Sequence, residues 1–126
     1  MRYLKAGMVA ASLVVSSAAL SDELKITVLY SQPQNSQEFD NYYYAQHMPM
    51  VYAVKQIKKV EIARPGPGPN GSLHPSYLVT ELWFENPEVF KSVAATPEWK
   101  AIAADVANFA PPDKVTILVS AVEPKK

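Results

Sequence analysis

The sequence contains no cysteine, only two histidines and only four glycines in 126 residues. The absence of cysteine excludes disulfide bonds, thiolate catalysis, cysteine-ligated zinc and iron–sulfur clusters. Basic and acidic residues number twelve each, so no excess of positive charge favours binding to nucleic acid. His47 and His74 lie far apart in the chain and form none of the short patterns of metal-ligating histidines. We therefore expect a protein without a bound metal ion or cofactor.

The N-terminus has the pattern of an export signal. Two basic residues precede an uncharged apolar run at 6–20, and small residues follow it. This order is typical of a secretory signal peptide, and about 15 apolar residues are fewer than the roughly 20 that span a bilayer. We expect cleavage of residues 1–21, so that a single domain at 22–126 is periplasmic or secreted, with no stable membrane insertion. The alternative is that the N-terminus is retained as an anchor.

An amphipathic helix is predicted for residues 36–50, with Ser36 as its N-cap. Pro49 lacks an N–H group and is expected to kink or restart this helix near Met48. Four side chains recur at spacings of four, four and three, so they share one inward face: Phe39, Tyr43, His47 and Met50. Tyr42 and Tyr44 flank that face, and we expect them at its rim.

The remaining elements follow from alternating and helical patterns. Strands are predicted at 24–30, 57–63, 76–85 and 115–122, and further helices at 87–95 and 97–109. The order strand, helix, strand, strand, helix, strand is the ferredoxin-like plan, an α+β fold with a four-stranded antiparallel sheet and helices on one face.

The strand at 76–85 is mostly apolar on both sides, so it is expected at the centre of the sheet. Tyr77, Val79, Glu81 and Trp83 share the side that helices would not cover. An apolar patch of this kind usually marks an interface. We therefore expect a symmetric dimer whose two sheets face each other and close a barrel around a cavity.

Residues 64–75 are rich in proline and glycine and are predicted to form a projecting loop. The stretch from Gly66 to Gly71 cannot hold a dinucleotide phosphate, because its prolines lack the necessary N–H groups and no helix follows. A lid, a spacer and an insertion without a role all remain open for this loop. His74 within it is expected to be exposed and without a role.

Three separated stretches resemble the EthD family of dimeric α+β barrel proteins: LKITVLYSQPQNSQEFDNYYYAQHMPM, YLVTELWFENPE and ATPEWKAIAADVANFAPP. Members of that family carry an aromatic helix that ends in His-x-Pro, a Glu-Leu-Trp-Phe strand and an Asn-Phe pair before the last strand. The resemblance covers about residues 24–122 and implies a homodimer with a barrel cavity. It departs from the family in its export signal and its longer loop at 64–75. Proteins with this barrel include cyclases, monooxygenases and isomerases, and EthD itself is tied to an ether-degrading oxidative system.

His47 resembles the helix-end histidine of the family, and with Tyr43 and Glu81 it makes a possible catalytic acid/base set. Such a set would abstract a proton next to a carbonyl, as in a cyclisation, an isomerisation or a dehydration. The expected substrate is a small hydrophobic or oxygenated organic molecule, and the expected substrate-binding residues are Tyr30, Phe39, Met50, Val79 and Trp83. Two alternatives remain: a non-catalytic binding or accessory module for a partner oxidative enzyme, and a purely structural dimer in which His47 only caps a helix.

Overall fold

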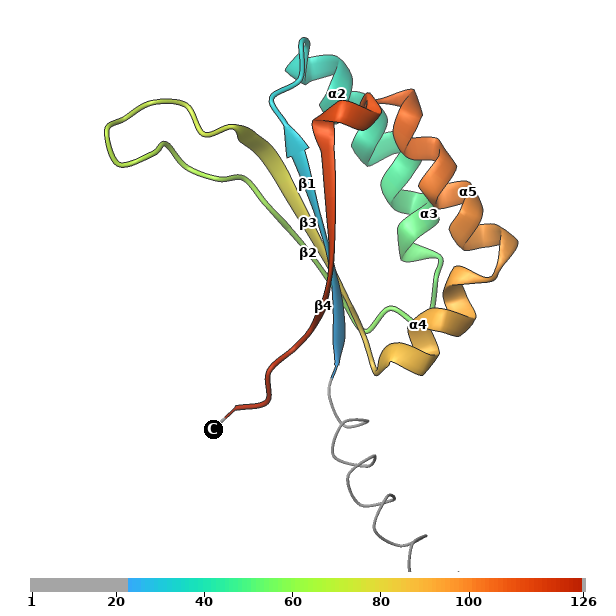
Figure 1. Cartoon of the computed structure of the whole chain (residues 1–126). Coiled ribbons are helices and arrows are strands. Elements are labelled where there is room, and N and C mark those ends of the chain that lie inside the picture. Colours follow the sequence, from blue (N-terminus) through green and yellow to red (C-terminus); the bar gives the residue numbers. More distant parts are fainter. Residues whose placement is uncertain (1–22, 126) are drawn as a thin grey trace, which may run out of the picture.

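The structure is a computed structural model, and it describes residues 23–125 of the chain. The expected signal peptide at 1–21 lies outside the described residues. Helices cover one face of a four-stranded antiparallel sheet in the order β2-β3-β1-β4, and the other face carries no helix (Figure 1). The α+β class, the order of the elements and the antiparallel sheet predicted from the sequence are confirmed.

The strands agree with the predicted ranges to within two residues, and β3 is central as expected. They are β1 (Leu24–Ser31), β2 (Lys59–Ala63), β3 (Ser76–Phe84) and β4 (Val115–Ala121). The first helical segment has three parts, α2 (Ser36–Tyr42), the π-helical turn η1 (Tyr43–His47) and α3 (Met48–Tyr52). The second has four parts, α4 (Pro87–Ala94), α5 (Pro97–Asp105) and the 3-10 turns η2 (Val106–Asn108) and η3 (Pro112–Lys114).

Side chains cap the helices where the sequence turns from extended to helical backbone. Asn35, rather than the predicted Ser36, is the N-cap of α2, because Asn35 is still extended and its Oδ1 accepts a bond from the N–H of Glu38 at 3.0 Å. Asn86 and Thr96 cap α4 and α5 in the same way. Each of these two helices then begins with proline, whose missing N–H costs nothing there.

The π-helical turn changes which methionine points inward. A π turn contains more residues than an α turn, so the inward spacing of four continues from His47 to Val51 instead of stopping at Met50. Val51 and Met48 are buried, whereas Met50 is only partly buried. The predicted restart at Met48 is confirmed. Met50 packs against the edge of the core and is only partly buried, and Val51 takes the fully buried position.

The core lies between the helices and the sheet. Alternate residues of β1 and β3 point toward the helices, and the register pairs Ile26 with Leu82 and Tyr30 with Leu78. All four are buried. Aromatic rings of the two helical segments pack on this layer, with Phe39 edge-on to Tyr30 at 5.4 Å between ring centroids.

A β-bulge moves Tyr77 away from the side of the sheet predicted for it. Tyr30 pairs with Leu78 but Ser31 pairs with Ser76, so Tyr77 is an extra residue in β3. Its ring packs edge-on against Phe39, on the helix side, at 5.3 Å. The open face therefore keeps Val79, Glu81 and Trp83 but not Tyr77.

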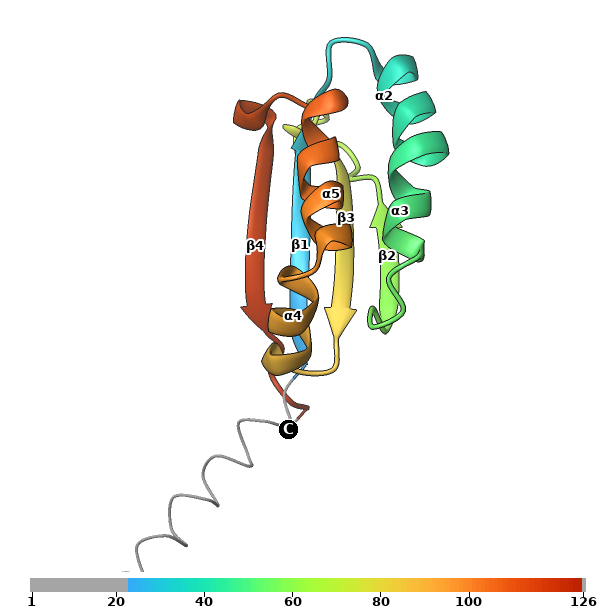
Figure 2. The same ribbon diagram turned by 90° about the vertical axis from the view of Figure 1, so that its right-hand side faces the viewer.

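The edge strand β4 is left uncovered on the helix side as well. Its pairing places Ile117 and Val119 on the same side as the core residues Val28 and Ile26. They are nevertheless 59% and 58% exposed, because α5 lies over β1 and β3 rather than over β4 (Figure 2). Within residues 23–125, no helix has the length and apolar character that crossing a membrane requires.

Candidate functional site

A partly buried hydrogen-bonded group joins the two helical segments. Oδ2 of Asp105 lies 2.9 Å from Nδ1 of His47, and the hydroxyl of Tyr42 donates to Oδ1 of Asp105 at 2.6 Å. Nδ2 of Asn108 donates to the same Oδ1 at 3.0 Å and to the Tyr42 oxygen at 3.1 Å. Asp105 ends α5, whereas Tyr42 and His47 come from α2 and η1, so only the tertiary fold assembles this group.

The π-helical turn explains how Tyr42 and His47 reach one carboxylate. Residues five apart in a regular α-helix point about 140° away from each other. In a π turn, residues five apart are hydrogen-bonded neighbours, and here the N–H of Met48 bonds to the carbonyl of Tyr43. The turn therefore brings both side chains to the side that faces α5.

The hydrogen bonds fix the charge state of Asp105. Burial acts to raise its pKa, but hydrogen bonds from Tyr42, His47 and Asn108 outweigh this effect and lower the pKa below its ordinary value. The carboxylate is then ionised at neutral pH and can only accept hydrogen bonds. It follows that Nδ1 of His47 carries a proton. The bond to Asp105 raises the pKa of Tyr42, which favours its hydroxyl form.

An open cleft of about 870 Å³ borders this group. It lies between the loop that joins β1 to α2 and the segment that follows α5. Phe39, Tyr42, Asn108 and Phe109 contribute to its wall, with carboxamide and charged side chains around them. His47 lies behind the wall, with its ring 4.8 Å from that of Phe109.

Buried tyrosines lie beneath the cleft. Tyr43 is fully buried, and its hydroxyl shares a short hydrogen bond with the hydroxyl of Thr80 on β3. Its ring stacks on Phe39 at 5.7 Å and on His47 at 5.9 Å. Burial raises the pKa of both Tyr43 and Tyr30. The expectation that Tyr43 points inward is confirmed, and Tyr44, which was expected to flank that face at the rim or at the dimer contact, is 47% exposed.

The structure separates Glu81 from the other two members of the predicted catalytic set. Glu81 follows Thr80 in β3, and successive strand residues point to opposite faces. Glu81 lies on the open face, where it pairs with Nζ of Lys25 at 3.0 Å and accepts a bond from Thr27 at 3.4 Å. No acid/base set of His47, Tyr43 and Glu81 is therefore assembled within one chain.

The predicted substrate-binding residues fall into three separate environments. Phe39 lines the 870 Å³ cleft, and Tyr30 is buried beneath it. Val79 and Trp83 lie on the open face, where Nζ of Lys59 is 4.5 Å from the centre of the Trp83 ring. Met50 lines a second cleft of about 550 Å³, between the end of α3 and the start of α5.

The sequence reasoning missed Asp105 and Asn108, and it placed Tyr42 only at a rim. Asp105 is one of the polar residues of the helix predicted at 97–109, and neither its neighbours nor its spacing mark it as a partner of His47. No local signal in the sequence marks these residues, because their contacts depend on how α5 packs beside α2 and η1.

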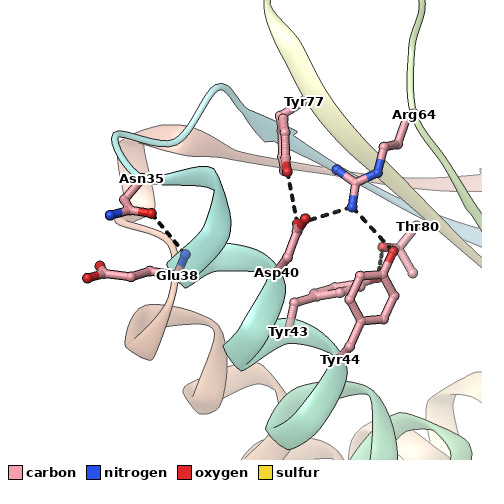
Figure 3. Close-up of polar contacts among 8 residues, drawn as sticks. All are labelled: Asn35, Glu38, Asp40, Tyr43, Tyr44, Arg64, Tyr77 and Thr80. Atoms are coloured by element: carbon pink, nitrogen blue, oxygen red, sulfur yellow. Dashed lines mark hydrogen bonds and ion pairs between the residues drawn. The ribbon is translucent and has the colours of Figure 1, made fainter.

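A second polar cluster joins α2 to both ends of the loop at 64–75 (Figure 3). Oδ1 of Asp40 accepts from Nη2 of Arg64 at 3.1 Å and from the Tyr77 hydroxyl at 2.9 Å. The Arg64 guanidinium also lies over the Tyr77 ring at 4.7 Å. Figure 3 shows Arg64 reaching toward the Tyr44 hydroxyl, which it meets at 3.5 Å.

His74 was expected to be exposed and idle, and this prediction is wrong. The residue is half-buried at the end of the loop, where its Nδ1 accepts from the N–H of Ser76 at 2.9 Å. Its carbonyl accepts from the side chain of Gln32 at 2.9 Å. Residues 23–125 contain no group of three or more histidine, aspartate or glutamate side chains suited to hold a metal ion.

The antiparallel sheet, the helices on one face and the element order define a ferredoxin-like α+β protein. The family model described as the EthD domain matches residues 31–113. The chain therefore belongs to the EthD domain family. An uncharacterized 11.0 kDa protein in the thcB-thcC intergenic region of Rhodococcus erythropolis is 30% identical over 86 residues, which is 68% of this chain and 82% of that protein.

Solved structures share the fold. An ethyl tert-butyl ether D family protein from Bacillus halodurans is 26% identical with a TM-score of 0.74, over 80% of this chain and 99% of that one. A hydroxynitrile lyase from Passiflora edulis is 14% identical with a TM-score of 0.66, over 84% of this chain and 98% of that one. Further neighbours are described as dimeric proteins of ferredoxin-like fold.

Proposed function

We propose that this protein is a homodimer that binds a small oxygenated or aromatic molecule in the 870 Å³ cleft and transfers a proton on it. The observation that carries the proposal is the Asp105 carboxylate held between His47 and Tyr42, where Tyr42 lies on the cleft wall. A carboxylate that orients a histidine and a hydroxyl beside an open cleft is a recurring arrangement for acid/base chemistry.

The roles of the residues follow from their hydrogen bonds. Asp105 holds the proton on Nδ1 of His47, which leaves Nε2 with the lone pair needed to accept a proton. The Tyr42 hydroxyl donates its hydrogen bond to Asp105, so its oxygen can accept a hydrogen bond from a ligand hydroxyl. Asn108 already donates a hydrogen bond to the Tyr42 oxygen, and this bond fixes the orientation of the hydroxyl group. The proposed catalytic set is therefore His47, Asp105 and Tyr42 instead of His47, Tyr43 and Glu81. His47 keeps the role of base.

The aromatic residues that line the cleft favour a small aromatic or oxygenated ligand. Tyr42 and Phe109 stack at 5.6 Å between ring centroids, and Phe39 closes the floor. Flat apolar ligands pack well on such rings, and the carboxamides at the mouth supply hydrogen bonds to oxygen atoms. The fold is shared with a hydroxynitrile lyase, which supports a catalytic role for a cleft of this kind.

The homodimer rests on the open face of the sheet. That face presents apolar Val79, Leu29 and Leu118 around the Lys25–Glu81 ion pair. Leu118 is 47% exposed. A second sheet packed on it would remove this apolar surface from water, and several neighbours of the same fold are dimeric. We also propose export of the mature domain, on the basis of the basic and apolar pattern at residues 1–21.

The alternative of a binding or accessory module has its own supporting observation. His47 is buried and does not itself line the cleft, so a ligand can occupy the cleft without a base at hand. In that case the protein would hold a ligand for a partner oxidative enzyme.

One experiment separates these functions. The mature chain is recovered from the exported fraction, and native mass spectrometry measures its oligomeric state and the mass of any bound molecule. Transfer to deuterated water then tests proton transfer, since a base next to a carbonyl exchanges a carbon-bound hydrogen and adds mass to the ligand. We expect a dimer with a ligand that gains deuterium, and no gain in His47→Gln. A bound ligand that never gains deuterium favours the accessory module, and an empty cleft in all preparations contradicts ligand binding.

A further inference from the structure

The loop at residues 64–75, called the arm below, projects from the side of the sheet that carries no helix (Figure 1). Figure 2 agrees, since the helices there stand in front of the sheet and the arm passes behind it. It holds Leu73, which is 76% exposed, more than any other large apolar residue among the described positions. Between Arg64 and Tyr77 the sequence has no Lys, Arg, Asp or Glu. An uncharged projection with an exposed leucine suits contact with another protein surface.

The arm is fixed at its base. Asp40 holds Arg64 and Tyr77, which stand at the two ends of the arm. The N–H of Gln32 bonds to the carbonyl of Pro75 at 3.2 Å, and its side chain bonds to the carbonyl of His74. The two ends of the arm are thus tied to α2 and to the end of β1.

The tip of the arm is also ordered by its own hydrogen bonds. The N–H of Gly68 bonds to the carbonyl of Ser72, and the N–H of Gly71 to the carbonyl of Gly68, each at 2.9 Å. Gly71 has a φ of 82°, a conformation that side chains disfavour. Prolines restrict the backbone between base and tip. Little conformational entropy is left for the arm to lose on binding, so preorganisation favours a docking role.

The reach of the arm matches the spacing of facing sheets. Ser76, where β3 begins, is three positions after Leu73, and three fully extended residues span at most about 10 Å. Two sheets that pack face to face also lie about 10 Å apart. A leucine held at that distance on the open side stands at the level of a second sheet placed there.

We propose that the arm is an intersubunit clasp, in which Leu73 of each protomer packs on a second copy of this chain. The proposal rests on the proposed homodimer and adds to it the element that secures the two protomers. The arm is continuous with the open face on which the second sheet would lie, and its uncharged surface matches the apolar side chains of that face. Because the dimer is symmetric, each dimer contains two such contacts.

The first test compares dimer dissociation constants by sedimentation equilibrium. Leu73→Asp is expected to raise the dissociation constant at least tenfold, since a buried leucine is worth about one order of magnitude or more in affinity and two are lost per dimer. Tyr52→Asp is the matched control, because Tyr52 is 59% exposed but lies on α3 in the helix layer. Circular dichroism confirms that both variants fold.

A second test maps the contact directly. The chain has no cysteine, so Leu73→Cys carries a single thiol for a maleimide–benzophenone crosslinker. Isotope-labelled and unlabelled chains are mixed before irradiation, and mass spectrometry identifies the joined peptides. Crosslinks between labelled and unlabelled chains are expected. Equal dissociation constants for wild type and Leu73→Asp would overturn the clasp, and so would crosslinks confined to one chain. Either result would leave the proposed homodimer unaffected. A wild type that stays monomeric at all concentrations overturns the homodimer itself.

Discussion

Oδ2 of Asp105 lies 2.9 Å from Nδ1 of His47, although 58 positions separate the two residues in the chain. The contact joins the end of α5 to the π-helical turn after α2. It orients a histidine whose side chain is only 5% exposed. The stability of the fold and the proposed proton transfer therefore depend on the same carboxylate.

Replacing that carboxylate should cost stability. Asp105→Asn removes the charge and leaves one oxygen to serve the donors of His47, Tyr42 and Asn108. Hydrogen bonds to a charged group contribute about 1.5–3 kcal/mol each, so we expect the free energy of unfolding to fall by roughly 2–3 kcal/mol. Urea denaturation measures the change. Asp113→Asn, at an exposed position, is the control and should stay within about 0.5 kcal/mol of wild type.

The Asp105 interaction should also depend on pH in a defined direction. The folded pKa lies below the ordinary 3.8, so the contribution of Asp105 to stability is present above about pH 4 and is lost as the pH falls through the folded pKa. The difference in unfolding free energy between wild type and Asp105→Asn should therefore shrink as the pH falls below about 4. Urea midpoints measured from pH 4 downward check it, and a difference that grows over that range contradicts the assignment.

The buried tyrosines should limit stability in alkali. Burial raises the pKa of Tyr30 and Tyr43 above the ordinary value of 10, so the folded state favours their neutral form. Their contribution is complete below pH 10 and is lost as the pH rises toward the folded pKa. Tyrosinate absorbance should show that Tyr30 and Tyr43 ionise only as the protein unfolds. Tyr30→Phe and Tyr43→Phe identify the absorbance change that belongs to these two residues.

The π-helical turn predicts unequal roles for two neighbouring methionines. Met48 is 1% exposed, whereas Met50 is only partly buried. Truncating a buried methionine to alanine costs about 2–5 kcal/mol, so Met48→Ala should destabilise the fold by that amount and Met50→Ala by clearly less. Thermal denaturation of the two variants provides a matched pair. Equal losses, or a larger loss at Met50, would mean that the helix keeps α-helical spacing through residues 43–47.

Much of the fold was predictable because it depends on local patterns. Alternation within 24–30 and 76–85 sets which residues face together, and proline after Asn86 and Thr96 marks the helix starts. The bulge at Tyr77 and the π turn were not predictable in this way. Each inserts one residue into a regular repeat, and the repeat alone does not show where an insertion falls.

For the candidate site, too, local patterns predicted one part and long-range contacts decided the rest. Local spacing identified Phe39, Tyr43 and His47 as one inward face, and their burial follows from it. It could not supply Asp105, because a hydrogen bond between distant segments depends on how α5 packs beside α2. It also joined Glu81 to His47, although alternation had placed Glu81 on the side that the helices do not cover, and the structure keeps it there.

The sequence by itself determined the order of the elements, the cysteine-free composition and the family, since these depend on residue type and local periodicity. Only the tertiary structure decided where the bulge and the π turn fall, which carboxylate meets His47 and on which side the arm projects. Those features arise from packing between segments that lie far apart in the chain. Other ways of packing the same segments would bury similar local patterns and would differ only in their long-range contacts.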